Sequence, residues 1–235
     1  MLRGLALVAG VLAIAVPSAH AFPRVRGCVR ADFDGVPAAR CGPASGARAV
    51  VVLHGCGGFS TFDHRLATEL PRFGITTLYV DYFSRTPPPG TRGFCSVWTR
   101  PEGLFATWER ITELAARSLR AHFAHVGAVG WSLGAGVALS TAEDTHTLDA
   151  VAAFSALAYP PVLDDAKALP PSIFLDGGNR DIVPPANAHR LYAAARAAHV
   201  PTALYVYGNG THGWPGAQGT AGIAHAAEFL VRELR

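Results

Sequence analysis

Apolar runs recur along the chain, and most of them lack strict alternation between apolar and polar positions. They are rich in Val, Ile and Leu, a pattern typical of strands that are buried on both faces, as in a parallel sheet covered by helices. We therefore expect strands over residues 47–55, 74–83, 125–132, 148–156, 171–178 and 202–210.

Segments with a helical period lie between these runs. We expect helices over residues 62–73, 101–123, 133–144, 185–199 and 220–234. Alternation of strand and helix predicts an α/β fold, a doubly wound, mostly parallel sheet with helices on both faces and right-handed crossovers. Residues 22–46, with a turn at Asp34–Gly35, predict an antiparallel hairpin at the edge of that sheet.

The first residues have the pattern of an export signal. Arg3 precedes the apolar run LALVAGVLAIAV, and Ala19 and Ala21 form the small-residue A-x-A pattern of a cleavage site. This run is shorter than the roughly 20 apolar residues of a membrane span. We expect a signal peptide over residues 1–21, cleavage near Ala21, and a periplasmic or secreted protein with a single domain over residues 22–235.

The four cysteines fit an exported protein with disulfide bonds. Four cysteines allow three pairings, and sequence alone does not choose among them. Cys28 and Cys41 flank the predicted hairpin, so a bond between them is the simplest choice, and it leaves Cys56 with Cys95. Because no C-x-x-C pair is present, we expect no metal site.

Charge and hydropathy exclude several classes of partner. The formal net charge is +3, and the basic residues form no block suited to nucleic acid. Half of the residues are hydrophobic, but no run after the signal is long enough to span a bilayer. We expect no nucleic-acid partner, no membrane span in the mature chain, and a monomer.

One serine lies between two glycines at a predicted strand-to-helix junction. Gly130-Trp131-Ser132-Leu133-Gly134 is a G-x-S-x-G pattern in the context that this motif requires. The turn holds the serine hydroxyl out at the carboxyl edge of the sheet, where sites form in open α/β folds. We interpret Ser132 as a catalytic nucleophile; the alternative is a glycine-rich turn that holds a serine by chance.

A serine nucleophile needs a base, and the base needs an orienting acid. His212 lies in a glycine-flanked loop after the last predicted strand and is our predicted base. His54, at a strand end, competes with it, but it precedes the serine. Asp181, in the loop after the 171–178 strand, is our predicted acid, and Asp176 is the alternative.

The segment LHGCGG follows the first long strand, and its glycines let the backbone bend so that an N–H points inward. We predict an oxyanion hole made of the Cys56 N–H and the Leu133 N–H, the latter from the residue after the nucleophile. The same glycines fit a phosphate cradle poorly, because the G-x-x-x-x-G-K-[ST] pattern is lacking.

Together these segments resemble the dienelactone hydrolase family of α/β-hydrolases. LHGCGG, VDYF, GWSLGAG, DGGNRDIVPP and THGW occur in that family's order over residues 47–232. The resemblance implies an α/β-hydrolase sheet of about eight strands, no cofactor, and ester or lactone hydrolysis. It implies the same roles for Ser132, Asp181, His212, Cys56 and Leu133. The family's namesake enzymes are cytoplasmic and use a cysteine nucleophile, so here we expect a small carboxylic ester as the substrate.

Aromatic residues in or beside the predicted rim loops suggest an apolar pocket. The predicted lining residues are Phe59, Tyr82, Trp131 and Trp214. Residues 84–103, which include Trp98, are irregular and are expected to overhang this pocket as a small cap. Two other function classes stay open: an acyltransferase with the same triad, and a non-catalytic binding protein of the same fold, which an intact triad disfavours.

Overall fold

The computed structural model describes residues 22–86, 95 and 102–235. The predicted signal peptide and most of the predicted cap, Trp98 included, lie outside these residues. The described residues form one eight-stranded sheet. Its strands are β1 (Val29–Phe33), β2 (Val36–Cys41), β3 (Gly46–Leu53), β4 (Thr76–Val80), β5 (Phe123–Trp131), β6 (Val151–Phe154), β7 (Ser172–Asp176) and β8 (Thr202–Val206).

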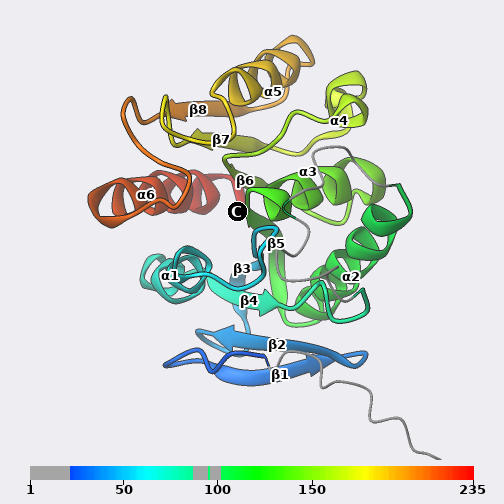
Figure 1. Ribbon diagram of the computed structural model, residues 1–235. Helices are drawn as coiled ribbons and strands as arrows, with labels where there is room; N and C mark the ends of the chain where they lie inside the picture. Colours follow the sequence, from blue (N-terminus) through cyan, green and yellow to red (C-terminus); the bar gives the residue numbers. More distant parts are fainter. Residues whose placement is uncertain (1–21, 87–94, 96–101) are drawn as a thin grey trace, which may run out of the picture.

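The sheet is mostly parallel, in the order β1-β2-β4-β3-β5-β6-β7-β8 (Figure 1). β1 and β2 form the antiparallel hairpin at one edge, and β2 joins the sheet antiparallel to β4. All later pairings are parallel. Each strand expected from an apolar run is present, and the hairpin lies at the edge as predicted.

Both faces of the central strands are buried, which is why the apolar runs do not alternate. Along β3, Val50 and Val52 pack into one core cluster, whereas Val51 and Leu53 pack into the other, and all four are fully buried. Side chains of α1 and α6 belong to the first cluster, and those of α2, α3 and α5 to the second. α1 and α6 lie on the opposite side of the central strands from α2 and α3 (Figure 1).

The helices follow the predicted segments with small shifts at their ends. They are α1 (Thr61–Glu69), the 3-10 turn η1 (Leu70–Phe73), α2 (Glu102–Arg120), α3 (Leu133–Thr145), α4 (Pro160–Asp164), the 3-10 turn η2 (Ala166–Ala168), α5 (Ala186–Ala197) and α6 (Gly216–Glu233). The break in the first helix comes where Pro71 enters η1. α4 was not predicted, because it is too short for a helical period, although Pro160 at its first position is a helix-start signal.

The chain changes direction across the sheet at β3. It passes from β3 to β4 on one side, and then crosses back through α2 to β5 on the other side of β3. Ligands in such sheets bind outside the carboxyl ends of the strands at this kind of reversal. Leu53 pairs with Gly130 in the register, so the loop after β3 and the turn after β5 lie next to each other.

Two disulfides connect the described cysteines. Cys28 is bonded to Cys41, with 4.3 Å between their Cα atoms, and Cys56 to Cys95, with 4.7 Å. The first joins the N-terminal segment to the end of β2, and the second joins the loop after β3 to a residue of the predicted cap. Across the part of the chain that is described, no helix combines the length and apolarity needed to cross a bilayer.

Candidate active site

Ser132 occupies a sharp turn between β5 and α3. Its φ of 56° and ψ of −118° lie in a region that residues other than glycine rarely adopt. The Ser132 N–H donates to the carbonyl oxygen of Phe154 at 2.8 Å, which holds the turn against β6. The side chain therefore stands at the carboxyl edge of the sheet instead of pointing into either core.

The two glycines of the motif are needed because backbone segments approach them closely. A Cβ on Gly130 would collide with the carbonyl of Gly134, and a Cβ on Gly134 would lie 2.5 Å from the carbonyl oxygen of Leu53. These contacts let α3 start directly behind β5 and beside the end of β3.

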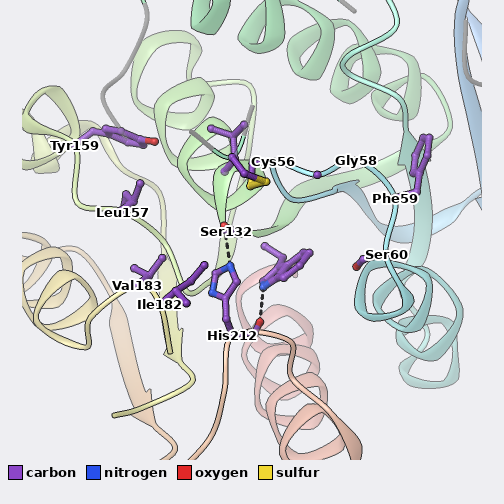
Figure 2. A pocket seen from close by; sticks show the side chains of 14 residues that line it. Cys56, Gly58, Phe59, Ser60, Ser132, Leu157, Tyr159, Ile182, Val183 and His212 are labelled. Atoms are coloured by element: carbon purple, nitrogen blue, oxygen red, sulfur yellow. Dashed lines mark hydrogen bonds between the residues drawn. A yellow bond between two sulfur atoms is a disulfide. The ribbon is translucent and has the colours of Figure 1, made fainter. Parts of the chain in front are cut away.

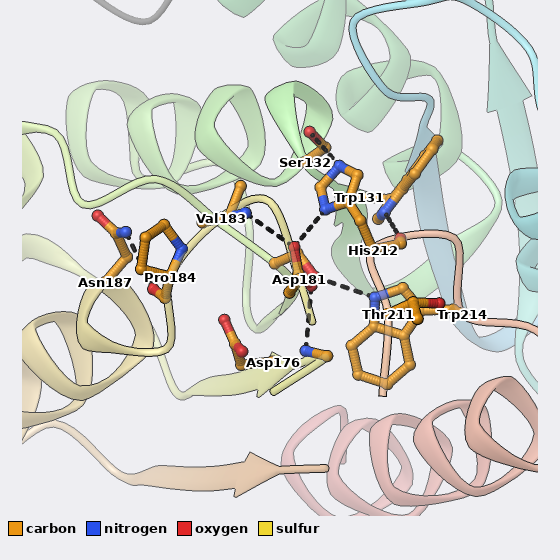
Figure 3. Close-up of polar contacts among 12 residues, drawn as sticks. Trp131, Ser132, Asp176, Asp181, Val183, Pro184, Asn187, Thr211, His212 and Trp214 are labelled. Atoms are coloured by element: carbon orange, nitrogen blue, oxygen red, sulfur yellow. Dashed lines mark hydrogen bonds and ion pairs between the residues drawn. The ribbon is translucent and has the colours of Figure 1, made fainter. Parts of the chain in front are cut away.

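The structure brings Ser132 and His212 together although they lie 80 positions apart in the sequence. His212 Nε2 lies 3.0 Å from Ser132 Oγ (Figure 3). His212 is held by its loop: Trp131 Nε1 donates to the His212 carbonyl oxygen at 2.9 Å. On α6, Gln218 clamps Thr211 with two bonds of 2.9 Å, one to its N–H and one to its carbonyl.

Asp181 completes the contact on the other side of the histidine. Its Oδ1 lies 2.6 Å from His212 Nδ1, and the carboxylate side chain has no solvent exposure. Burial alone raises the pKa of Asp181, but the hydrogen bonds from His212 and Ser155 outweigh it, so the pKa lies below its usual value. An ionised Asp181 places the proton on Nδ1 and leaves Nε2 to accept the hydroxyl proton of Ser132.

The alternative candidates lie elsewhere. Asp176 is fully buried and accepts the N–H of Gly178 at 2.7 Å, so it orders the turn after β7. Burial, with the nearby Asp181 charge, raises the pKa of Asp176 to about 6. His54 is also fully buried, with its ring stacked on Tyr82 at 4.2 Å between centroids. Within the described residues, the hydrogen bonds of the His212 ring go to Asp181 and Ser132, and not to Asp176 or His54.

The two predicted oxyanion donors flank Ser132. Leu133 begins α3, so its N–H has no acceptor one turn earlier in the helix. Cys56 lies in a tight turn in which the Gly58 N–H donates to the Gly55 carbonyl oxygen at 3.1 Å. Within the described residues, the Cys56 N–H has no hydrogen-bond acceptor. Both residues line the same cavity as Ser132.

A cavity of about 240 Å³ opens over Ser132 (Figure 2). Apolar side chains gather on one side of Ser132 and His212, and the loop after β3 forms the other side. Its lining residues are Cys56, Gly57, Gly58, Phe59, Ser60, Cys95, Trp131, Ser132, Leu133, Leu157, Tyr159, Ile182, Val183 and His212. The described part of the chain contains no group of three or more His, Cys, Asp or Glu placed to hold a metal ion.

The predicted pocket residues divide into two groups. Phe59 and Trp131 line the cavity as expected. The prediction was wrong for Tyr82 and Trp214, which are 0% and 1% exposed. Tyr82 donates its hydroxyl to the His54 carbonyl at 2.9 Å inside one core, and Trp214 stacks on Phe62 inside the other. Large aromatic rings gain more from core burial than from lining an open rim.

Among the described lining residues, sequence reasoning missed four apolar ones. Leu157 and Tyr159 follow β6, and Ile182 and Val183 directly follow Asp181. The signal that could have identified them is position, because each lies in the loop that follows the carboxyl end of a parallel strand. Leu157 lies in a short apolar segment that has no aromatic cluster or glycine-rich turn to mark it.

The strand order, the reversal at β3 and the serine turn between β5 and α3 are those of the α/β-hydrolase fold. Within that class, the chain belongs to the dienelactone hydrolase family, whose model matches residues 36–231. It is accordingly a carboxylic ester hydrolase. No curated protein matches the chain.

Solved structures share this fold at low sequence identity. A dienelactone hydrolase from Anabaena variabilis is 19% identical, with a TM-score of 0.64 over 88% of this chain and 97% of that one. A dienelactone hydrolase-like promiscuous phosphotriesterase from metagenomic libraries is 16% identical, with a TM-score of 0.70 over 88% and 98%. An esterase from Pyrococcus furiosus is 16% identical, with a TM-score of 0.67 over 88% and 92%.

Proposed function

We propose that the protein hydrolyses small esters through a Ser132–His212–Asp181 triad and an acyl-enzyme. The observation that carries this proposal is the unbroken hydrogen-bond path from Ser132 Oγ through the imidazole to a buried carboxylate, with distances of 3.0 and 2.6 Å. This is the arrangement in which a histidine can take a serine proton while an acid orients the ring.

In the first step, His212 Nε2 removes the Oγ proton as Ser132 Oγ bonds to the carbonyl carbon of the ester. The carbonyl oxygen becomes an oxyanion, which the N–H groups of Cys56 and Leu133 stabilise. When the intermediate collapses, the bond between carbon and the alcohol oxygen breaks. The leaving alcohol takes the proton from His212, and the acyl group stays on Ser132.

In the second step, a water molecule gives a proton to His212 Nε2 and attacks the acyl carbon. Collapse of this intermediate releases the carboxylic acid and returns the proton to Ser132 Oγ. Asp181 stays ionised throughout and stabilises the imidazolium that forms in each step. Its low pKa and full burial support this assignment.

We assign a neutral ester with a short, apolar acyl group as the substrate class. The described lining residues include no Asp, Glu, Lys or Arg, and the side of the cavity beyond Ser132 is formed by Leu157, Ile182 and Val183. Apolar walls with a few directed polar groups favour uncharged ligands. We expect butyrate esters to be cleaved with a lower KM than acetate esters, because they bury more apolar surface.

A fluorophosphonate probe tests the nucleophile directly. We expect one adduct, located at Ser132 by peptide mass spectrometry, and none in Ser132→Ala. We also expect Ser132→Ala to lose about 10⁴-fold or more in kcat on p-nitrophenyl butyrate while its circular dichroism spectrum stays unchanged. An adduct on Ser60, the other serine among the described lining residues, would contradict the proposal. Added alcohol that gains the acyl group in preference to water would indicate acyl transfer.

We further propose that residues 1–21 direct export and are removed near Ala21. The two disulfides support this, because such bonds persist in oxidising compartments. The intact mass of protein from a secreting host tests it, with a mature chain that begins at Phe22 as the expected result. A mass that retains residues 1–21 contradicts it.

A further inference from the structure

Ser155 is a buried serine that contacts the proposed acid, Asp181, on the carboxylate oxygen that does not face His212. It follows β6 directly, is fully buried, and has a φ of 47°, in the left-handed region that favours glycine. Its Oγ donates to Asp181 Oδ2 at 2.5 Å. It also receives the indole N–H of Trp214 at 3.0 Å. Ser155 does not line the substrate cavity.

These two bonds determine where the hydroxyl proton points. The indole Nε1–H of Trp214 can only donate, so it occupies a lone pair of Ser155 Oγ. The single proton of Ser155 is then directed at Asp181. A strained backbone conformation persists only where neighbouring contacts hold it in place. At Ser155 these contacts include a hydrogen bond from its N–H to the Leu175 carbonyl oxygen at 2.7 Å.

The carboxylate of Asp181 is held on both oxygens (Figure 3). Oδ1 accepts from His212 Nδ1 at 2.6 Å and from the Val183 N–H at 2.9 Å. Oδ2 accepts from Ser155 at 2.5 Å and from the Gly177 N–H at 3.2 Å. Without Ser155, Oδ2 would keep only the longer of its two bonds, and the carboxylate plane would be freer to rotate away from the imidazole.

We propose that Ser155 is a positioning residue for the ester hydrolysis proposed above: with Trp214 behind it, its hydroxyl locks the Asp181 carboxylate in the plane that orients His212. The inference rests on the proposed triad. Ser155 acts through Asp181 and does not touch the substrate, so its removal affects the chemical step and not substrate binding.

The primary test compares Ser155→Ala with Ser172→Ala as a matched control. Ser172 is also fully buried, but it starts β7 at the opposite edge of the sheet, where its Oγ donates to Pro170 O at 2.8 Å. We expect Ser155→Ala to lower kcat on p-nitrophenyl butyrate by about 10- to 100-fold with KM within about twofold. Ser172→Ala should leave both constants within about twofold of wild type.

A double-mutant cycle separates positioning from a general structural role. If Ser155 acts through Asp181, Ser155→Ala should change kcat by less than about twofold in an Asp181→Asn background. A merely structural serine would lower activity equally in both backgrounds. Ser155→Gly covers the case in which alanine does not fold, because glycine adopts this φ without strain and still removes the hydroxyl.

The outcomes distinguish this inference from the proposal beneath it. Wild-type kcat in Ser155→Ala or Ser155→Gly, or an equal loss in the Asp181→Asn background, overturns the role of Ser155 and leaves the triad intact. A Ser132→Ala variant that stays active overturns the triad itself, whatever Ser155 does.

Discussion

At the scale of single residues, environment separates two aspartates that are five positions apart. The side chains of Asp181 and Asp176 are both buried, but only that of Asp181 is hydrogen-bonded to His212, at 2.6 Å. Hydrogen bonds from donors keep the pKa of Asp181 below its usual value, although burial opposes them, whereas burial raises that of Asp176 to about 6. One carboxyl thus stays an anion to lower pH than an ordinary aspartate, and the other takes up a proton as the pH falls through about 6.

This difference predicts unequal effects of two matched substitutions. Asp181→Asn should lower kcat by about 10⁴-fold, because an amide no longer holds the imidazole in the tautomer that accepts the serine proton. Asp176→Asn should stay within about tenfold of wild type, since the amide Oδ1 can still accept the Gly178 N–H that orders the turn after β7. Steady-state kinetics on p-nitrophenyl butyrate check both. The reverse order of losses would move the acid to Asp176.

At the scale of elements, the residue that caps the start of α1 also forms part of the cavity wall. Ser60 is the N-cap of α1 and also lines the cavity. Its N–H and its hydroxyl both donate to Asp63 Oδ2, at 3.0 and 2.7 Å. Asp63 is fully buried, and burial raises its pKa to about 8, although the bonds from Ser60 oppose this. Asp63 is therefore mostly protonated at pH 7. Its hydrogen bonds with the N-cap Ser60 hold the end of the loop that contains Phe59.

A raised carboxyl pKa makes stability fall as pH rises. Between its ordinary pKa near 3.8 and about 8, folded Asp63 keeps a proton that the unfolded chain releases. The contribution of Asp63 to the free energy of unfolding therefore decreases as pH rises across this window and levels off above it. Asp63→Asn does not titrate, so its stability relative to wild type should improve from pH 5 to pH 9. Urea unfolding at pH 5, 7 and 9 measures the difference, and parallel curves for the two proteins would exclude this role.

At the scale of the whole molecule, one disulfide connects the loop after β3 to a residue far along the chain. Cys56 carries a proposed oxyanion donor, and its bond to Cys95 spans 39 residues. Both cysteines line the cavity. The Cys28–Cys41 bond spans only 13 residues and lies at the hairpin, away from the cavity. Removing one bond or the other therefore separates an effect on stability alone from an effect on both stability and activity.

Removing the Cys56–Cys95 bond should lower both stability and activity. Closing a loop of this length contributes about 3–4 kcal/mol through chain entropy. Cys56→Ser and Cys95→Ser should have similar effects that do not add, because each breaks the same bond. Cys28→Ser with Cys41→Ser should lower the unfolding temperature but leave kcat unchanged. Alkylation of Cys56 without prior reduction would exclude the bond.

The sequence by itself determined the order of the elements and the candidates for the proposed chemistry. Unbroken apolar runs such as residues 47–55 predict strands that are buried on both faces. This prediction needs only the composition and the period of the run itself. Ser132 and His212 were found because a glycine-flanked polar residue after an apolar run marks the carboxyl end of a strand. These signals are local, so they can be read from neighbouring residues.

Only the tertiary structure decided which side chains meet. It placed Asp181, and not Asp176, against His212, and it put Tyr82 and Trp214 in the core while Leu157 and Val183 line the cavity. It also brought Ser155 to the far oxygen of Asp181. Each of these outcomes depends on contacts between strand ends that lie 20 or more residues apart. The physical reason is that burial and hydrogen bonding depend on packing across the sheet, which leaves no trace in the period of a single segment.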